Sequence, residues 1–211
     1  MLGAVDGDAE LVERLRRGDQ AAFAVLVDRY HSRLTRFAGS FTPRAELAED
    51  IAQETWLGLL RGLDRFEGRA SLRTWLFQIC ANRARTIAAR EGRLVPVDPT
   101  DPDAPTVDPA RFGPDGGWST APAAWDTAAD DAELVARVRA AIVRLPETQQ
   151  QVVTLRDVEG LTSVEVCRIL ELTEGNQRVL LHRGRARVRA LLEQERLEQD
   201  RPEQDQEVPT R

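Results

Sequence analysis

Residues 45–93 constrain the fold more than any other part of the chain, because two helical patterns of opposite charge follow each other there. In the first pattern, mostly apolar residues recur at steps of three and four, the spacing of a helix face that packs on a core. These residues are Ala48, Ile51, Ala52, Thr55, Trp56, Leu59, Leu60 and Leu63. The opposite side, called the acidic face below, consists of Glu46, Glu49, Asp50, Gln53 and Glu54. We therefore predict an amphipathic helix with an acidic outer surface.

The second pattern is basic. Five arginines and a single acid, Glu91, lie between residues 73 and 93, which gives this part a net charge of +4. A short polar loop over residues 63–70 separates it from the acidic helix, and Ser71 is a candidate N-cap for the basic helix. The apolar side of that helix includes Trp75, which favours the core, although a stacking platform for a base is the alternative. An acidic surface suits a basic protein partner, and a basic surface suits nucleic acid.

Two further helices are predicted before this stretch. Residues 8–17 have a short amphipathic pattern that ends at Gly18, and Asp19 is a plausible N-cap for a helix over residues 20–38. No alternating strand pattern is present in this part of the sequence. Residues 8–93 therefore predict a compact all-α domain of four helices.

The composition changes at residue 94. Residues 94–131 contain seven of the eleven prolines and eight aspartates against one arginine. Proline and repelling charge oppose a packed core, so we predict a disordered acidic linker. Phe112, Trp118 and Trp125 are exceptions in this linker, and either dock onto another surface or are merely tolerated.

Residues 132–196 predict a second all-α domain of four helices, expected over residues 134–145, 147–158, 163–170 and 174–194. Thr162 and Glu165 have the spacing of a capping box. The last helix is basic, with six arginines against three glutamates over residues 174–196. Two helices joined by a tight turn, the second one basic, are typical of a helix-turn-helix. The acidic tail, residues 197–211, is predicted to be disordered.

The net charge, the cysteine positions and the length of apolar runs exclude several classes of protein. The net charge of −6 would argue against a nucleic-acid binder, but charge is segregated along the chain, so the balance within each domain decides. Cys80 and Cys167 lie far apart in apolar helix patterns, which predicts buried reduced thiols, and no metal or cofactor is expected. We find neither a signal-peptide pattern nor an apolar run long enough to span a membrane, so a cytoplasmic protein is expected.

Three blocks of sequence resemble a known family. They are AEDIAQETWLGLL, RFEGRASLRTWLFQICANRAR and LPETQQQVVTLRDVEGLTSVEVCRILELTEGNQRVLLHRGRARVRALL. In this order they resemble the extracytoplasmic-function (group IV) sigma factors, over residues 8–93 and 132–193. The resemblance implies two helical domains that bind core RNA polymerase and promoter DNA, recognise the −10 and −35 elements and melt the duplex. It also implies an anti-sigma protein as a partner, and neither catalysis nor a cofactor.

The resemblance assigns roles by position. Asp50, Gln53 and Glu54 match the polymerase-binding face, for which a solvated polar surface is the alternative. The −10 loop and the helix behind it match Asp64, Arg65, Phe66, Arg69, Ser71, Arg73, Asn82, Arg83 and Arg85. The −35 recognition helix matches Thr173, Glu174, Gly175, Asn176, Gln177, Arg178, His182, Arg183 and Arg185.

The recognition helix departs from the common pattern of the family. Gln177 stands where a valine is usual, and Val179 and Leu180 stand where small or basic polar residues are usual. A slightly rotated helix would explain this, which leaves the base contacts open. His182 is either a DNA contact or a surface histidine of the helix.

Two other functions are alternatives to a sigma factor. A free-standing helix-turn-helix regulator that binds DNA as a dimer would leave the acidic face without a function. An enzyme has no support, because Asp50 and Glu54 have no nucleophile, metal cluster or glycine-rich phosphate loop beside them in the sequence.

Overall fold

The computed structural model describes residues 3–90 and 131–199, and these residues form helices and loops without a strand. The first helical unit contains α1 (Gly3–Arg16), α2 (Gln20–Ala38), α3 (Ala45–Gly62), the 3₁₀ turn η1 (Leu63–Arg65) and α4 (Leu72–Arg90). The second contains α5 (Asp131–Val143), α6 (Glu147–Val153), the π-helical turn η4 (Thr154–Val158), α7 (Ser163–Leu170) and α8 (Glu174–Gln199). The predicted all-α class is confirmed for the described residues. Most of the predicted linker, with Phe112, Trp118 and Trp125, lies outside them.

Local capping interactions begin three of the helices. The side chain of Asp19 accepts a hydrogen bond from the Ala22 amide at 3.0 Å, and Ser71 Oγ accepts one from the Thr74 amide at 3.1 Å. Thr162 and Glu165 form the reciprocal bonds of a capping box. These side chains satisfy amides that would otherwise lack partners at the helix N-termini. The predictions for all three caps are confirmed.

The core of the first unit is aromatic and aliphatic. Phe37 packs edge-on against Phe41 and Phe77, with ring centroids 5.3 and 5.4 Å apart. Helices α3 and α4 approach so closely at Gly58 that a Cβ added there would lie 2.8 Å from Ile79 Cγ2. The first unit is therefore one packed body in which α3 and α4 are held rigidly together.

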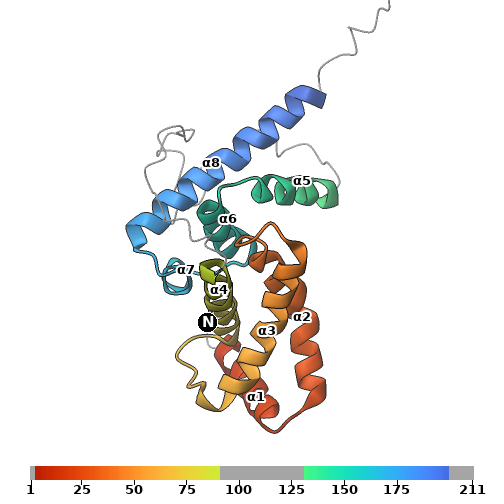
Figure 1. The fold of residues 1–211 in the computed structure, drawn as a ribbon, viewed down its shortest axis with the longest axis vertical. Helices are drawn as coiled ribbons and strands as arrows, with labels where there is room; N and C mark the ends of the chain where they lie inside the picture. The colour runs from red at the N-terminus through yellow and green to blue at the C-terminus, as the bar shows by residue number, and fades with distance from the viewer. Residues whose placement is uncertain (1–2, 91–130, 200–211) are drawn as a thin grey trace, which may run out of the picture.

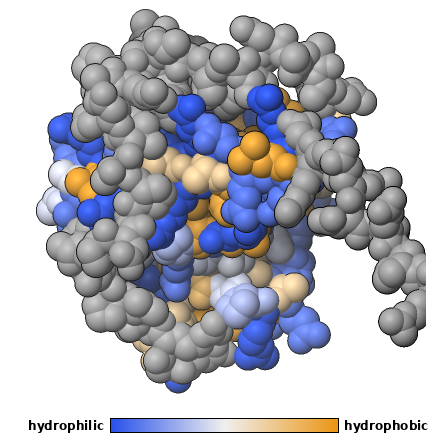
Figure 2. Space-filling view, turned by 90° about the horizontal axis from the view of Figure 1, so that it is seen from above, coloured by the Kyte–Doolittle hydropathy of each residue, from blue (hydrophilic) through white to orange (hydrophobic). Residues whose placement is uncertain are grey.

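The core of the second unit forms where α8 crosses α6. A Cβ added at Gly184 would lie 2.6 Å from Val153 Cγ2, so the glycine permits this crossing. Helix α8 continues beyond the unit as the long blue helix of Figure 1. Seen from above, the described surface is mainly hydrophilic with small apolar patches between the polar residues (Figure 2).

Some expectations were wrong in detail. Leu60 is 48% exposed instead of buried, because it lies on the side of α3 that faces away from α4. Cys80 is buried, and burial raises the pKa of its thiol to about 12, but Cys167 is only half-buried on the short helix α7. The helix expected over residues 147–158 passes into the π-helical turn η4. Helix α8 extends into the tail as far as Gln199, since no proline interrupts its helix-forming residues before Pro202.

Candidate nucleic-acid and protein-binding site

The acidic face lies on the exposed side of α3. Asp50, Gln53 and Glu54 all point to solvent. Leu57 and Leu60, 50% and 48% exposed, follow them at helical spacing. The sequence reasoning missed these leucines as surface residues, although their positions one and two turns after Gln53 could have placed them there. The face therefore combines negative charge with exposed apolar area.

A hydrogen-bond network links Glu49 of the acidic face to residues of α2 and to Trp56. Glu49 accepts a hydrogen bond from Thr35 at 3.1 Å and lies 2.8 Å from Nε2 of His31. The indole of Trp56 donates to Nδ1 of the same His31 at 3.2 Å, so Nε2 carries the hydrogen that Glu49 accepts. Burial raises the pKa of Glu49, but hydrogen bonds from His31, Thr35 and Gln53 outweigh it and leave the pKa below its ordinary value.

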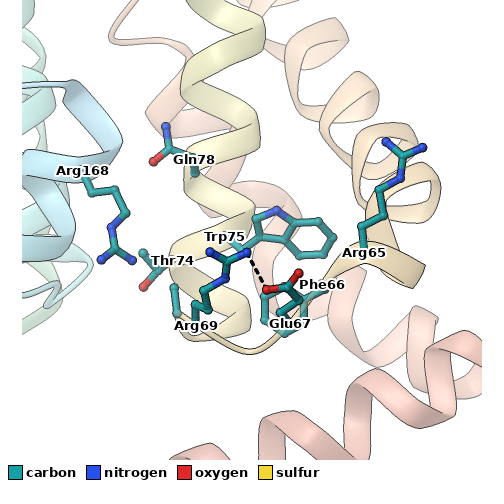
Figure 3. A pocket seen from close by; sticks show the side chains of 9 residues that line it. Arg65, Phe66, Glu67, Arg69, Thr74, Trp75, Gln78 and Arg168 are labelled. Carbon is teal, nitrogen blue, oxygen red and sulfur yellow. Dashed lines mark ion pairs between the residues drawn. The ribbon is translucent and has the colours of Figure 1, made fainter.

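The loop between α3 and α4 forms one wall of a pocket. Phe66 and Trp75 stack with their ring centroids 4.7 Å apart, and Arg69 forms an ion pair with Glu67 at 2.5 Å (Figure 3). Arg65 and Arg69 line the pocket and are exposed. In the same loop Asp64 is exposed and Ser71 is half-buried. Trp75 is half-buried, so one part of it packs on the core while its ring also lines the pocket. Trp75 thus contacts the core, while its use as a stacking platform for a base stays a prediction.

A residue that the sequence reasoning missed also lines this pocket. The side-chain oxygen of Gln78 is buried without a hydrogen-bond partner, while its amide nitrogen donates to Asn82 at 3.3 Å. Gln78 lies one turn after Trp75 on α4 (Figure 3). An amide oxygen at this position can accept a hydrogen bond from a group that enters the pocket.

The arginines of α4 are not all open to solvent. Arg83 lies 3.8 Å from Glu54, which joins the acidic face directly to the basic helix. Arg73 donates to the main-chain oxygen of Glu159, and Arg85 donates to that of Ile169, each at 3.0 Å. Arg85 also bonds to Asn82 at 2.6 Å and to Glu171 at 2.7 Å. Two of the predicted DNA contacts therefore touch the second helical unit.

Other bonds join the two units beside these arginines. Arg33 on α2 donates to the carboxylate of Glu159, whose side chain is only 1% exposed. Thr74 on α4 donates to Glu165 on α7, and Gln151 donates to the main-chain oxygen of Ser40 at 3.3 Å. Arg168 of α7 reaches the wall of the Phe66–Trp75 pocket (Figure 3). Helix α7 thus lies against α4.

The helix-turn-helix is formed by α7 and α8. Thr173 caps α8 by accepting a hydrogen bond from the Asn176 amide at 3.2 Å. Glu174, Gly175 and Arg178 are exposed in its first turns, while His182 and Arg183 are half-buried. The first turns of α8 thus present polar side chains, among them the exposed Arg178, to solvent.

Two expected DNA contacts on α8 face the protein instead. Gln177 is 3% exposed and accepts a hydrogen bond from Ser163 at 2.8 Å. Arg185 forms two bonds to the carboxylate of Asp157, at 2.9 and 2.6 Å. Helix α8 is oriented about its axis so that Gln177, Leu181 and Gly184 share its buried side, and this orientation turns both side chains toward the protein. In this arrangement the side chains of Gln177 and Arg185 are thus not presented to solvent, unlike the sequence-based expectation.

No helix in the described ranges is long and apolar enough to cross a membrane. Within residues 3–90 and 131–199, no cluster of His, Cys, Asp and Glu could hold a metal ion.

Comparison with known proteins gives two matches to family models. The family described as Sigma-70 region 2 matches residues 26–94, and Sigma-70, region 4 matches residues 136–188. The chain is 32% identical to the RNA polymerase sigma-H factor of Pseudomonas aeruginosa over 84% of this chain and 90% of that protein. It is 30% identical to the ECF RNA polymerase sigma-E factor of Escherichia coli K12 over the same shares.

Two solved structures resemble the whole arrangement of helices. CnrH in complex with the cytosolic domain of CnrY gives a TM-score of 0.55 at 23% identity, covering 89% of this chain and 97% of CnrH. RpoE in complex with the anti-sigma factor NepR from Bartonella quintana gives 0.54 at 22% identity, covering 81% and 96%. At these identities the likeness concerns the fold.

Proposed function

The chain belongs to the extracytoplasmic-function family of RNA polymerase sigma factors, and on this premise we propose which of its surfaces bind the polymerase and the promoter. A protein of this family recruits core polymerase to promoters, recognises the −35 and −10 elements and melts the DNA for initiation. It is a transcription initiation factor. We propose that it acts in the cytoplasm and has no catalytic activity of its own, the chemistry of RNA synthesis belonging to the polymerase.

The acidic face is the proposed polymerase-binding surface. The observation that supports this most is the exposure of Asp50, Gln53 and Glu54 on one side of α3, next to the exposed Leu57 and Leu60. Exposed apolar side chains beside complementary charge are typical of a protein interface, and the charge guides the approach of a basic partner. The network around His31 and Glu49 keeps this surface in place.

Binding to purified core polymerase tests this assignment. In an anisotropy titration of the labelled full chain, we expect the variant Asp50→Arg/Glu54→Arg to bind core at least about tenfold more weakly than the wild type. Asp28→Arg is the control, because Asp28 is an exposed acid on a different helix, α2. Equal affinities for the double variant and the wild type would overturn the assignment.

The loop with Asp64, Arg65, Phe66, Arg69 and Ser71 is the proposed −10 reader. Its pocket has an aromatic pair, Phe66 and Trp75, and exposed arginines on its rim. Aromatic rings stack on unpaired bases and arginines neutralise phosphates, which is what a melted strand requires. Asn82 and Arg83 continue this surface along α4, where Arg83 also contacts Glu54. Polymerase docking on the acidic face would therefore place the pocket at the opened DNA.

The start of α8 is the proposed −35 reader. Thr173, Glu174, Gly175 and Arg178 are exposed there, with Asn176, His182 and Arg183 half-buried beside them. Helix N-termini and arginines are the usual means of entering the major groove. Gln177 and Arg185 are left out of the proposed contacts because their side chains face α7 and η4.

We propose that the two helical units separate before the protein binds the −10 element. In the proposed DNA complex Arg73 and Arg85 contact phosphates of the promoter, but here both donate hydrogen bonds to the second unit. The described arrangement is therefore the form that is not bound to DNA. In the solved relatives, CnrH is bound to CnrY and RpoE to the anti-sigma factor NepR. An anti-sigma protein that stabilises the joined units is the partner we propose for this chain.

A further inference from the structure

Helix α1 contacts the beginning of the proposed −10 loop through one side chain. The guanidinium of Arg16 donates to the main-chain oxygen of Leu63 through Nε at 3.2 Å and through Nη2 at 3.1 Å. Nη2 also donates to the main-chain oxygen of Phe66 at 2.7 Å. The same side chain thereby fixes both the 3₁₀ turn η1 and the backbone of the residue whose ring forms the pocket.

Helix α1 also contacts the end of the loop. The carboxylate of Asp8 accepts a hydrogen bond from the amide of Leu72 at 2.8 Å. Leu72 is the first residue of α4, so its amide has no partner within the helix, and a carboxylate there is further stabilised by the helix dipole. Asp8 and Arg16 lie about two turns apart in α1, roughly 12 Å along its axis. Together they span the loop from its first residues to its last.

We propose that Asp8 and Arg16 are positioning residues for reading of the −10 element, holding the loop of residues 63–71 in the shape that captures a base. This rests on the proposed −10 role of that loop. The Sigma-70 region 2 match begins at residue 26, after both residues. Asp64, Glu67, Gly68 and Arg69 are all exposed, so the loop is held otherwise mainly by the stacking of Phe66 on Trp75 and by the ion pair of Glu67 with Arg69.

Docking of α1 itself does not depend on Arg16. Val12 and Leu15 are 3% and 6% exposed and pack into the core of the first unit, whereas the Arg16 side chain is 29% exposed. A change at Arg16 should therefore leave α1 in place and release the carbonyls of Leu63 and Phe66, together with the carboxylate of Glu13, which pairs with Arg16 at 2.6 Å on the same helix. Arginine is suited to this task because its planar guanidinium reaches two carbonyls at once, which a lysine ammonium does less well.

The test uses holoenzyme assembled from core polymerase and the full chain. The probe is a fork-junction DNA whose single-stranded −10 segment comes from a promoter mapped with the wild-type protein, with 2-aminopurine reporting base capture. We expect Arg16→Ala to bind this probe about tenfold more weakly and to discriminate less between correct and substituted −10 bases. Asp8→Asn should act in the same direction, and Arg16→Lys should restore part of the loss. Affinity for core and the thermal unfolding midpoint should stay near the wild-type values.

The controls are Arg17→Ala and Glu10→Gln, which change an exposed residue directly after α1 and an exposed residue on it. Wild-type discrimination in Arg16→Ala would overturn the proposal, and so would a loss matched by Arg17→Ala. A lowered unfolding midpoint with unchanged base discrimination would also overturn it, since Arg16 would then serve stability alone. The variant Phe66→Ala separates the proposed −10 role of the loop from the proposed positioning role of Asp8 and Arg16. If it leaves −10 binding unchanged, the loop is not the reader and the proposed function of the loop fails, whereas a defect in Phe66→Ala without one in Arg16→Ala refutes only the positioning role.

Discussion

Arg33 and Glu159 are 126 residues apart in the sequence, yet they form an ion pair that joins the two helical units. The Arg33 Nε atom lies 2.8 Å from the Glu159 carboxylate, which is 1% exposed. Arg73 donates to the main-chain oxygen of the same glutamate from α4. Glu159 is thus held by the α2 and α4 arginines of the first unit.

Removal of Arg33 should therefore open the molecule. Arg33→Ala leaves a buried carboxylate without its cation, and the loss of one partner of a buried pair costs about 3–5 kcal/mol. Separation of the units relieves this cost by exposing Glu159 to water. We expect a larger radius of gyration by small-angle X-ray scattering and tighter binding of the free protein to −10 single-stranded DNA. Arg29→Ala, on the exposed side of the same helix, is the control. An unchanged radius would show that the pair does not hold the units together.

The pH dependence of folding should depend in part on Glu49. The pKa of this group is lowered in the folded protein, so the unfolded chain binds its proton more readily. The stability that Glu49 contributes is therefore complete above its pKa in the unfolded chain, near the ordinary value of 4.5, and is lost as the pH falls through the lower folded pKa. Glu49→Gln should flatten the fall in the free energy of unfolding below about pH 4.5.

The comparison for this measurement is Glu46→Gln on the same helix, where the glutamate is exposed. Since Asp19 and Glu165 also have lowered pKa values, the difference between the two variants carries the information and not either curve alone. Identical slopes for both variants would contradict the role of the His31–Glu49 network.

On the recognition helix, Arg178 and Gln177 should behave differently although they are neighbours. Arg178 is exposed, and its replacement by alanine should remove about 1–3 kcal/mol of discrimination at one base pair of the −35 element. Gln177 is buried against Ser163, so Gln177→Ala should lower stability by about 1 kcal/mol and leave the base preference unchanged. A selection of −35 sequences from a random library, done with each variant, checks this. A changed preference in Gln177→Ala would show that α8 is rotated relative to the described arrangement.

Local chemistry made much of the fold predictable. The helix over residues 20–38 has the bounds expected from its apolar spacing and the Asp19 cap, and the capping box at Thr162 places α7 correctly. These signals lie within a few residues of the structure they determine, so one sequence suffices to read them.

The remaining features depend on contacts between distant residues. Nothing near Glu159 in the sequence indicates that Arg33 lies against it, and nothing near Arg16 indicates the carbonyls of Leu63 and Phe66. The direction of each side chain on α8 likewise depends on how the helix packs against α6 and α7, which buries Gln177 and turns Arg185 toward Asp157. The sequence therefore sufficed to propose candidate site residues, but it could not predict the contacts that surround them.

Transcription in vitro tests the central claim most directly, namely that the acidic face holds the polymerase while the loop and α8 read the promoter. Purified core polymerase and the full chain are combined with genomic fragments, and the transcription start sites are mapped. We predict discrete start sites that share two upstream elements at constant spacing, and their loss with Asp50→Arg/Glu54→Arg but not with Asp28→Arg. Start sites without shared elements, or full activity of the double variant, would contradict the account.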